Sequence, residues 1–445
     1  MRYANESELL GQGILILDYG SQYTLLIARR IRELGVYCEI WPCNDERVHH
    51  LEQGSVKGLI LSGGPSSVDL PGAPSLRDEL VTVGVPILGI CYGMQLIAHT
   101  LGGGVRRGNH GEYGRTAVDI AEPHGLMAGF SPQQRLTVWM SHGDEVERVP
   151  EGFEVLARSQ AGVIAAMQSQ DRQLSAVQFH PEVTHSEGGT HILSNFVFEL
   201  AGCEPTWNMG NFLDRTVDAL RQQIGEGRVI CGLSGGVDST VVAALLWRAI
   251  GERLTCVFVD TGLLRQGERE QVESLFRSHF PADLRVIDAS DRFLGALAGE
   301  EDPEKKRKII GEHFVRVFEE VARGLEDASF LAQGTLYPDV IESVSIRGPS
   351  ATIKTHHNVG GLPEDLNLKL VEPLRELFKD EVRALGKELG LPEAFIKRHP
   401  FPGPGLGVRI LGEVTPERAA TVRAADHLFI NALHEFGHYD DVWQA

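Results

Sequence analysis

Residues 86–101 read PILGICYGMQLIAHTL, and this stretch decides how the first half of the chain folds. An apolar run, 86–90, leads into a cysteine between glycines, and a helix-like segment follows. Strand, turn and helix in this order form one step of an α/β sheet. The turn resembles a nucleophile elbow, which would lift the Cys91 side chain clear of the strand end, and the positive end of the helix would favour its thiolate. The alternative interpretation is a buried core cysteine.

Similar apolar runs alternate with helix-like segments along the whole chain. The strands that we expect are 14–18, 58–61, 86–90 and 174–179 in the first half, and 229–233, 254–260, 284–287 and 330–333 in the second. This alternation predicts an α/β protein with two doubly wound parallel-sheet domains. We place the domains at residues 1–203, 204–400 and 401–445, the last beginning in a segment rich in Gly and Pro.

Composition excludes several classes of protein. Apolar residues make up 42% and charged residues 23% of the chain, as in ordinary globular proteins, so disorder is excluded. The formal net charge of −19 argues against binding to nucleic acid, which needs a basic face. No run has the length of a signal peptide or a membrane span, so we expect a cytoplasmic protein with no membrane partner. Six cysteines without a C-x-x-C pair indicate neither a zinc site nor a disulfide framework.

Two more strand ends in the first half carry residues suited to catalysis. His180, Pro181 and Glu182 follow the run 174–179, and a histidine oriented by a carboxylate can act as a general base. Ser62-Gly63-Gly64-Pro65 follows the run 58–61, and its amides could face a developing oxyanion. Taken singly, the first could be a turn with a solvated Glu, and the second a tight loop.

Four segments together, SGGP, GICYGMQ, WMSHGD and FHPE, resemble the class I (triad) glutamine amidotransferases in sequence and order. The resemblance implies that Cys91 is the nucleophile, His180 the base and Glu182 its orienting partner. It also implies oxyanion donors at the Gly64 and Tyr92 amides and glutamine-binding residues at Gln95, Ser141 and His142. A thiolate would attack the amide of glutamine, release ammonia and leave a thioester that water hydrolyses.

A second site is predicted where the run 229–233 enters SGGVDST, residues 234–240, ahead of a helix. Backbone amides at such a junction bind anions. The segment lacks the G-x-x-x-x-G-K-[ST] pattern of common NTPases, which indicates a different ATP chemistry. Asp238 would repel phosphates unless a divalent ion lay between them, and this points to Mg²⁺ as the cofactor. The alternative is that Asp238 or Ser239 only caps the helix.

SGGVDS resembles the phosphate loop of the ATP pyrophosphatases, which cleave ATP to AMP and pyrophosphate while adenylylating a substrate. The resemblance implies that the ATP-binding residues are Ser234, Gly235, Gly236, Val237, Asp238, Ser239 and Thr240, with Val259, Asp260 and Leu263 receiving adenosine. For 259–263 a plain strand-to-helix loop is the alternative.

Two further segments leave more than one interpretation open. The pair His356 and His357 suggests a metal, but adjacent side chains on a strand point opposite ways, so shared ligation is not expected. The basic run 305–308 is either a solvated helix face or part of a lid that closes over phosphates.

The segments TLYPDVIES, KTHHNVGGLP and RHPFPGPGLGVR resemble the GMP synthetase family, and this resemblance covers nearly the whole chain. It implies that glutamine, ATP and xanthosine monophosphate (XMP) are the substrates. ATP would adenylylate the 2-oxygen of XMP, and ammonia would displace AMP to give GMP. The residues implied for adenylylation and XMP binding are Gln333, Gly334, Thr335, Asp339, Glu342, Lys354 and Arg398.

The same resemblance implies that residues 401–445 begin an α+β dimerisation domain that continues past Ala445 in the family. We therefore expect a homodimer only with that domain complete, and we expect the chain to keep glutamine hydrolysis and ATP binding but to lose full synthesis. An apolar side of the last helix, at Leu428, Ile430 and Leu433, should then be poorly covered. The rival functions are another glutamine-dependent adenylylating synthetase, of the NAD or asparagine type, and a nucleotide sensor without turnover.

Overall fold

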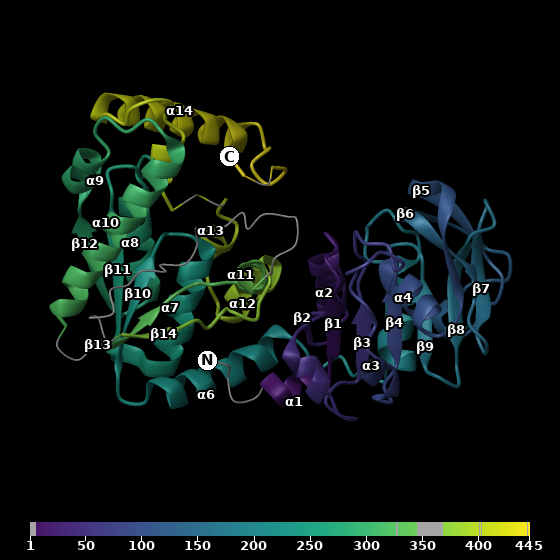
Figure 1. Cartoon of the computed structure of the whole chain (residues 1–445). Helices are drawn as coiled ribbons and strands as arrows, with labels where there is room; N and C mark the ends of the chain where they lie inside the picture. The colour runs from purple at the N-terminus through teal and green to yellow at the C-terminus, as the bar shows by residue number, and fades with distance from the viewer. Residues whose placement is uncertain (1–5, 326–327, 345–367, 400, 402, 443) are drawn as a thin grey trace. The chain divides into compact units, whose positions relative to one another are not determined.

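The structure, a computed structural model, describes residues 6–325, 328–344, 368–399, 401, 403–442 and 444–445. These residues divide into two compact units, one ending at Asn208 and the other beginning at Met209 (Figure 1). Lys354, His356 and His357 lie outside the described residues. Among the helices of the described segments, none has both the length and the apolar character needed to cross a membrane.

The first unit is built on one sheet of nine strands in the order β2-β1-β3-β4-β9-β8-β7-β5-β6. The strands are β1 (Ile14–Asp18), β2 (Cys38–Pro42), β3 (Gly58–Leu61), β4 (Ile87–Ile90), β5 (Gly104–Ile120), β6 (Arg135–Arg148), β7 (Glu154–Ser159), β8 (Ile164–Ser169) and β9 (Leu174–Val177). The helical segments are α1 (Glu6–Leu10), α2 (Thr24–Glu33), η1 (Glu46–His50), α3 (Asp78–Thr82), α4 (Tyr92–Thr100), η2 (Gly125–Met127), α5 (Gly189–Ser194) and η3 (Asn195–Leu200).

This first sheet is mixed, which the sequence analysis did not foresee. Strands β2, β1, β3, β4 and β9 are parallel, as expected of a doubly wound sheet. From β9 onward, β8, β7, β5 and β6 continue the sheet with antiparallel pairing. The parallel strands carry continuous apolar runs because both of their faces are buried, whereas β6 alternates between more and less buried positions. The α/β class is confirmed. The sheet of the first unit is larger than a doubly wound parallel sheet, because antiparallel strands continue it.

The second unit has a fully parallel sheet of five strands in the order β12-β11-β10-β13-β14. The strands are β10 (Arg228–Leu233), β11 (Leu254–Asp260), β12 (Asp283–Asp288), β13 (Ala328–Ala332) and β14 (Lys369–Val371). The helical segments are α6 (Met209–Ile224), α7 (Val237–Ile250), η4 (Gly251–Arg253), α8 (Glu268–His279), α9 (Ser290–Ala296), α10 (Pro303–Arg323), α11 (Tyr337–Val344), α12 (Lys379–Glu388), α13 (Glu393–Ile396), η5 (Gly405–Val408) and α14 (Pro416–Glu435). The strand order reverses beside β10, which is where ligands bind in doubly wound folds.

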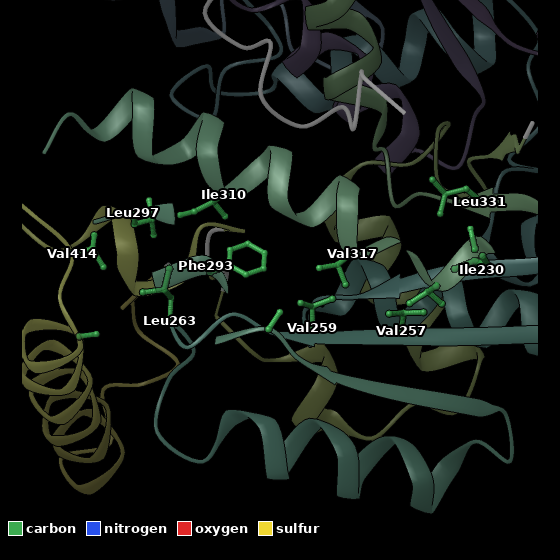
Figure 2. Packing of buried hydrophobic residues seen from close by; sticks show 14 of the residues in the cluster. Ile230, Val257, Val259, Leu263, Phe293, Leu297, Ile310, Val317, Leu331 and Val414 are labelled. Carbon is green, nitrogen blue, oxygen red and sulfur yellow. The ribbon is translucent and has the colours of Figure 1, made fainter. Parts of the chain in front are cut away.

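Helices cover both faces of this second sheet. Val257 and Val259, two residues apart on β11, face one core with Phe293 of α9 and Val317 of α10 (Figure 2). Helices α6 and α12 pack with α7, which contacts β10 and β11. Because neighbouring strand residues point to opposite faces, the central strands β10 and β11 are buried on both sides, and the candidate site segments lie at the strand ends.

The basic run 305–308 does not behave as a uniform solvated face. Lys306 is fully buried in α10, and its Nζ donates to the carbonyl oxygens of Ile410, at 2.9 Å, and Gly412. Burial lowers the pKa of this lysine. Lys305, Arg307 and Lys308 are exposed. Of the four basic residues, Lys306 therefore binds the segment 410–412 to α10, and the other three lie at the surface.

Candidate active sites

Cys91 stands on a strained turn between β4 and α4. Its φ of 53° and ψ of −104° lie in a region that non-glycine residues rarely occupy. The flanking glycines are required by close backbone approaches: a Cβ at Gly89 would lie 2.6 Å from the Gly93 carbonyl oxygen, and a Cβ at Gly93 would lie 2.4 Å from the Leu61 carbonyl oxygen. The G-x-C-x-G spacing therefore fits helix α4 tightly against β3 and β4, with the cysteine at the junction.

His180 and Glu182 follow β9, the strand next to β4, and the structure brings them to Cys91. Nδ1 of His180 lies 2.7 Å from Oε1 of Glu182, and both side chains are almost completely buried. The edge of the Tyr23 ring meets the imidazole, with ring centres 4.9 Å apart. The His180 carbonyl accepts a hydrogen bond from Ser186 Oγ at 2.6 Å, which fixes the turn.

The environment of His180 favours the charged imidazole. Burial lowers the pKa of the ring, but hydrogen bonds to the Cys91 thiol and the Glu182 carboxylate, together with the charges of both groups, raise it further, to about 10. An imidazolium beside a cysteine stabilises the thiolate, which is the nucleophilic form. The three side chains that the resemblance assigns to a triad, from separate segments of the sequence, thus meet at one place in the structure.

The loop Ser62–Pro65 passes directly beside the thiol. A Cβ at Gly63 would lie 3.3 Å from Cε1 of His180 and 3.6 Å from Cβ of Cys91, so only glycine leaves room for a substrate. Within the described part of the chain, the Gly64 and Tyr92 amides donate no backbone hydrogen bond. Both remain available to an oxyanion, in the role expected of them.

Of the three residues expected to hold glutamine, Ser141 contacts the Cys91 sulfur, and Gln95 and His142 share a hydrogen-bond partner. Sγ of Cys91 is 3.7 Å from the Ser141 carbonyl oxygen. Nε2 of Gln95 donates to the Asp144 carbonyl at 2.9 Å, and Nδ1 of the buried His142 ring is 3.0 Å from the same oxygen. Gln95 of α4 is thereby joined to the middle of β6.

Two residues of this site were not predicted. Nε2 of Gln178 donates to Sγ of Cys91 at 3.8 Å. Glu112 of β5 lies 3.3 Å from Nε2 of His142 and accepts a hydrogen bond from Ser159 Oγ at 2.7 Å. Burial raises the pKa of Glu112, but the hydrogen bonds to His142 and Ser159 outweigh it and lower the pKa overall. Glu112 sits directly opposite His142 in the β5–β6 pairing, so a predicted hairpin would have found it.

The second site is the turn between β10 and α7. Gly235 has a φ of 73°, which favours glycine. Ser234 and Ser239 close the loop, since their hydroxyl oxygens are 3.1 Å apart and the Ser234 amide donates to Ser239 Oγ at 3.1 Å. Thr240 Oγ1 donates to the Gly236 carbonyl at 2.9 Å. The loop presents amides at the start of a helix of 14 residues, a favourable place for phosphate.

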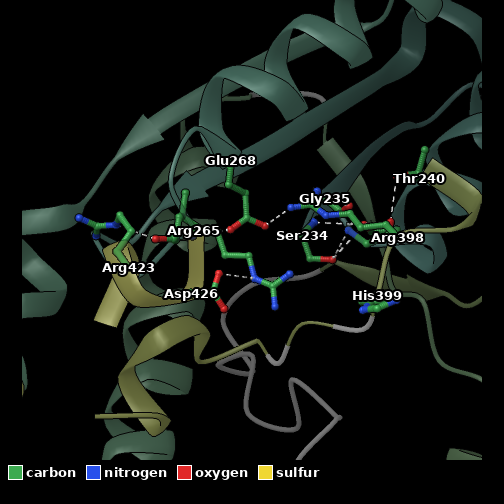
Figure 3. Close-up of polar contacts among 12 residues, drawn as sticks. Ser234, Gly235, Thr240, Arg265, Glu268, Arg398, His399, Arg423 and Asp426 are labelled. Atoms are coloured by element: carbon green, nitrogen blue, oxygen red, sulfur yellow. Dashed lines mark hydrogen bonds and ion pairs between the residues drawn. The ribbon is translucent and has the colours of Figure 1, made fainter. Parts of the chain in front are cut away.

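Arg398, just before the Gly-Pro-rich segment, lies against this loop in the structure. Its Nη1 donates to the Gly235 carbonyl at 2.8 Å, and its Nη2 pairs with Glu268 at the start of α8 (Figure 3). Asp238, the first-turn carboxylate of α7, pairs with Lys379 through Oδ2. Oδ1 of Asp238 is buried and has no hydrogen-bond partner among the described residues.

Comparison with known proteins follows the same two-part division. Residues 15–200 match the family of class-I glutamine amidotransferases, and residues 210–275 match the family described as NAD synthase. GMP synthase (glutamine-hydrolyzing) of Symbiobacterium thermophilum is 54% identical over 97% of this chain and 83% of its own length. The enzyme of the same name from Maridesulfovibrio salexigens is 54% identical over 97% of this chain and 84% of that protein. The one from Thermobifida fusca is 55% identical over all of this chain and 85% of that protein. The chain belongs to the glutamine-hydrolysing GMP synthase family.

The residues that the ATP pyrophosphatase resemblance assigns to adenosine lie at the end of β11 and in the turn that follows it. Asp260 accepts from the Gly262 amide at 2.9 Å and pairs with Arg269 at 3.3 Å, beside a pocket of about 340 Å³. Val259 and Leu263 are buried. Leu263 has no exposed surface and packs with Phe293 in the core of Figure 2, and its carbonyl accepts from Leu406, so its side chain is not available to a nucleotide.

The remaining assignments that follow from GMP synthases lie after β13. Gly334 is close to the phosphate loop, since a Cβ there would be 3.4 Å from Cβ of Asp238. Thr335 Oγ1 donates to Glu372 at 2.6 Å, and Asp339 accepts from the Leu336 amide at 3.1 Å, as a helix-capping carboxylate does. The Gln333 amide donates to the Val371 carbonyl and so belongs to the sheet edge. Glu342 belongs to α11, while Lys354 falls in the segment that the structure does not describe.

Proposed function

We propose that this chain makes GMP from XMP, taking nitrogen from glutamine and energy from the cleavage of ATP to AMP and pyrophosphate. The observation that carries the proposal is the meeting of Cys91, His180 and Glu182 at one strand edge, in a chain whose second unit holds a phosphate loop. Similarity to glutamine-hydrolysing GMP synthases over 97% or more of the chain supports it.

Glutamine hydrolysis starts from the ion pair of Cys91 and His180. The thiolate attacks the side-chain amide carbon of glutamine, and the amides of Gly64 and Tyr92 bind the oxygen as it becomes negative. His180 gives its proton to the departing nitrogen, so ammonia leaves and a glutamyl thioester remains. Neutral His180 then takes a proton from water, which attacks the thioester, and glutamate and the ion pair are restored.

In the second unit, the loop 234–240 binds the phosphates of ATP. Its amides and the N-terminus of α7 face the anion, and Arg398 and Lys379 add positive charge. The 2-oxygen of XMP attacks the α-phosphorus and pyrophosphate leaves. Ammonia then adds to C2 of the purine, the carbon that bears the adenylylated oxygen. AMP departs from this carbon, and it is a better leaving group than the unmodified oxygen would be.

Asp238 is the residue that we assign to Mg²⁺. Its buried Oδ1, which has no partner among the described residues, suits a hard cation, and Mg²⁺ is usually held by one or two carboxylates together with substrate phosphates. The described residues hold no cluster of three or more His, Cys, Asp or Glu for a resident ion, which fits an ion that arrives with ATP. When bound, the ion would neutralise phosphate charge.

A homodimer, formed when the C-terminal domain is complete, is part of the same proposal. Leu428 and Phe429 of α14 are 70% and 57% exposed, and Phe436 beyond it is 72% exposed. Apolar surface of this kind is typical of a helix that packs against another chain or domain. Analytical ultracentrifugation of the chain measures the association state, and Leu428→Lys should shift any dimer toward monomer.

The function is tested by supplying the purified chain with Mg-ATP, glutamine and one acceptor at a time. We expect GMP, AMP, pyrophosphate and glutamate with XMP, and none of the corresponding products with aspartate or with a deamido-NAD acceptor. Amination of an acceptor other than XMP would refute the proposal and favour a synthetase of the NAD or asparagine type. A nucleotide sensor would release no glutamate.

A further inference from the structure

Glu268 is a buried carboxylate for which the sequence motifs predicted no role. It is the first residue of α8, a helix of 12 residues, and only 2% of its surface is exposed. Oε1 pairs with Nη2 of Arg398, and Oε2 accepts from the Arg265 amide at 2.8 Å. A charged carboxylate is costly to bury unless both oxygens are paired. Here both are, and one partner is a residue of the phosphate site.

Arg398 contacts the phosphate loop through Nη1, the terminal nitrogen that does not pair with Glu268. Nη1 donates to the Gly235 carbonyl at 2.8 Å, while Nη2 is occupied by Glu268 (Figure 3). The packing is close, because a Cβ at Gly235 would lie 2.7 Å from Nη1 and 2.7 Å from Cγ2 of Val272 on α8. Helix α8 thus reaches the loop twice, directly through Val272 and through the pair of Glu268 and Arg398.

The bond to Gly235 fixes the direction of a loop amide. A peptide group is planar and trans, so the carbonyl of Gly235 and the amide N–H of Gly236 point in opposite directions. Holding the carbonyl on Arg398 directs that N–H to the other side, where it lies 3.3 Å from Ser234 Oγ. Gly235 has a φ of 73° and little intrinsic preference for one conformation, so an outside contact decides its orientation.

We propose that Glu268 is a positioning residue for the nucleotide site: its buried carboxylate holds Arg398 on the Gly235 carbonyl and so fixes the phosphate loop in the shape that binds ATP. The inference rests on the proposed role of residues 234–240 in ATP binding. Glu268 itself touches no substrate. Without its charge, Arg398 is free to rotate away, and the Gly235–Gly236 peptide must be ordered by the ligand at a cost in affinity.

The test is calorimetric titration of the full chain with Mg-ATP. Glu268→Gln keeps the shape of the side chain but removes its charge, and we expect the dissociation constant to rise about tenfold or more. The matched control is Glu273→Gln on the same helix, which breaks a partly exposed pair with Arg277 and should leave the constant within about twofold. In an Arg398→Met background, Glu268→Gln should add less than about twofold, since the carboxylate acts through that arginine.

Thermal unfolding shows whether each variant is folded. If the carboxylate of Glu268 had only a structural role, Glu268→Gln would unfold at a lower temperature than the wild type but, where folded, would bind Mg-ATP with the same affinity. That result overturns the inference. If Glu268→Gln does not fold, the double variant Glu268→Gln/Arg398→Met decides, because it leaves no unpaired charge at this buried position: ATP affinity equal to that of the wild type contradicts the inference. A wild-type chain that binds no Mg-ATP would instead refute the proposed function.

Discussion

At position 180 an imidazole is buried between a sulfur and a carboxylate, and this single residue sets the chemistry of the first unit. Glu182 contributes only one oxygen to it; the other, Oε2, is buried without a hydrogen-bond partner in the described structure. A carboxylate kept in this state costs stability, and the imidazolium beside it offsets part of that cost. The Arg30 side chain donates to the Glu182 carbonyl at 3.0 Å and so fixes the backbone that carries the carboxylate.

Replacing this carboxylate should change how stability depends on pH. The pKa of His180 is raised to about 10, above its ordinary value of 6.5, so its charged form stabilises the folded state. That contribution is complete below about pH 6.5 and is lost as the pH rises through about 10. Glu182→Gln lowers the folded-state pKa. We therefore expect the difference in free energy of unfolding between wild type and Glu182→Gln to be largest near pH 6.5 and to shrink toward pH 10.

Denaturant unfolding of the chain at several pH values, followed by probes in the first unit, measures this difference. Glu151→Gln, which removes an exposed carboxylate, is the control and should give a difference that is small at every pH. If the wild-type and Glu182→Gln curves run parallel between pH 6.5 and 10, His180 is not held charged by its partner.

At the scale of strands and helices, local pattern was sufficient wherever a segment is buried on both sides. The expected run 254–260 is β11 itself, and 14–18 and 58–61 are β1 and β3. The apolar runs 86–90, 174–179 and 229–233 end directly before Cys91, His180 and the loop 234–240, so these residues could be placed on strand ends in advance. Both triad partners follow from this because the carboxyl ends of β4 and β9 are neighbours.

Elements and contacts that depend on distant pairing could not be predicted in this way. Strand β5 is polar and rich in glycine, and it is recognised as a strand through its pairing with β6 and β7, so Glu112 was missed with it. Leu263 was assigned by resemblance to the nucleotide, yet its burial depends on α9 and α10, which lie further along the chain. Glu268 was missed because its partner Arg398 is 130 residues away.

The elbow glycines allow a prediction about the element β4–Cys91–α4. Gly93→Ala would place a Cβ 2.4 Å from the backbone oxygen of Leu61, which belongs to a central strand and has no room to move. We expect a loss of about 1–3 kcal/mol in the free energy of unfolding, together with a large loss of glutaminase activity as α4 and Cys91 shift. Gly311→Ala in α10, where no atom lies within 4 Å, is the control and should be neutral or stabilising. Normal stability and activity in Gly93→Ala would mean that the turn is not tightly packed.

At the scale of the whole molecule, two compact units each carry a separate chemistry on their own sheet. All of the residues assigned to glutamine hydrolysis lie before Asn208, and all of those assigned to ATP follow Met209. No side chain is shared between the two sets. A substitution at the thiol should therefore remove the nitrogen supply without altering the steps that consume it.

Cys91→Ala should lower glutamine-dependent formation of GMP and glutamate by about 10⁴-fold or more, because the nucleophile is lost. With ammonium chloride in place of glutamine, the same variant should form GMP at the rate of the wild-type chain, since free ammonia needs only the second unit. Cys43→Ala, which removes a thiol elsewhere in the first unit, should leave both activities intact. Parallel loss of the ammonia-dependent and glutamine-dependent rates in Cys91→Ala would show that the two sites do not work separately, because a thiol buried in one sheet would then be needed for adenylylation on the other.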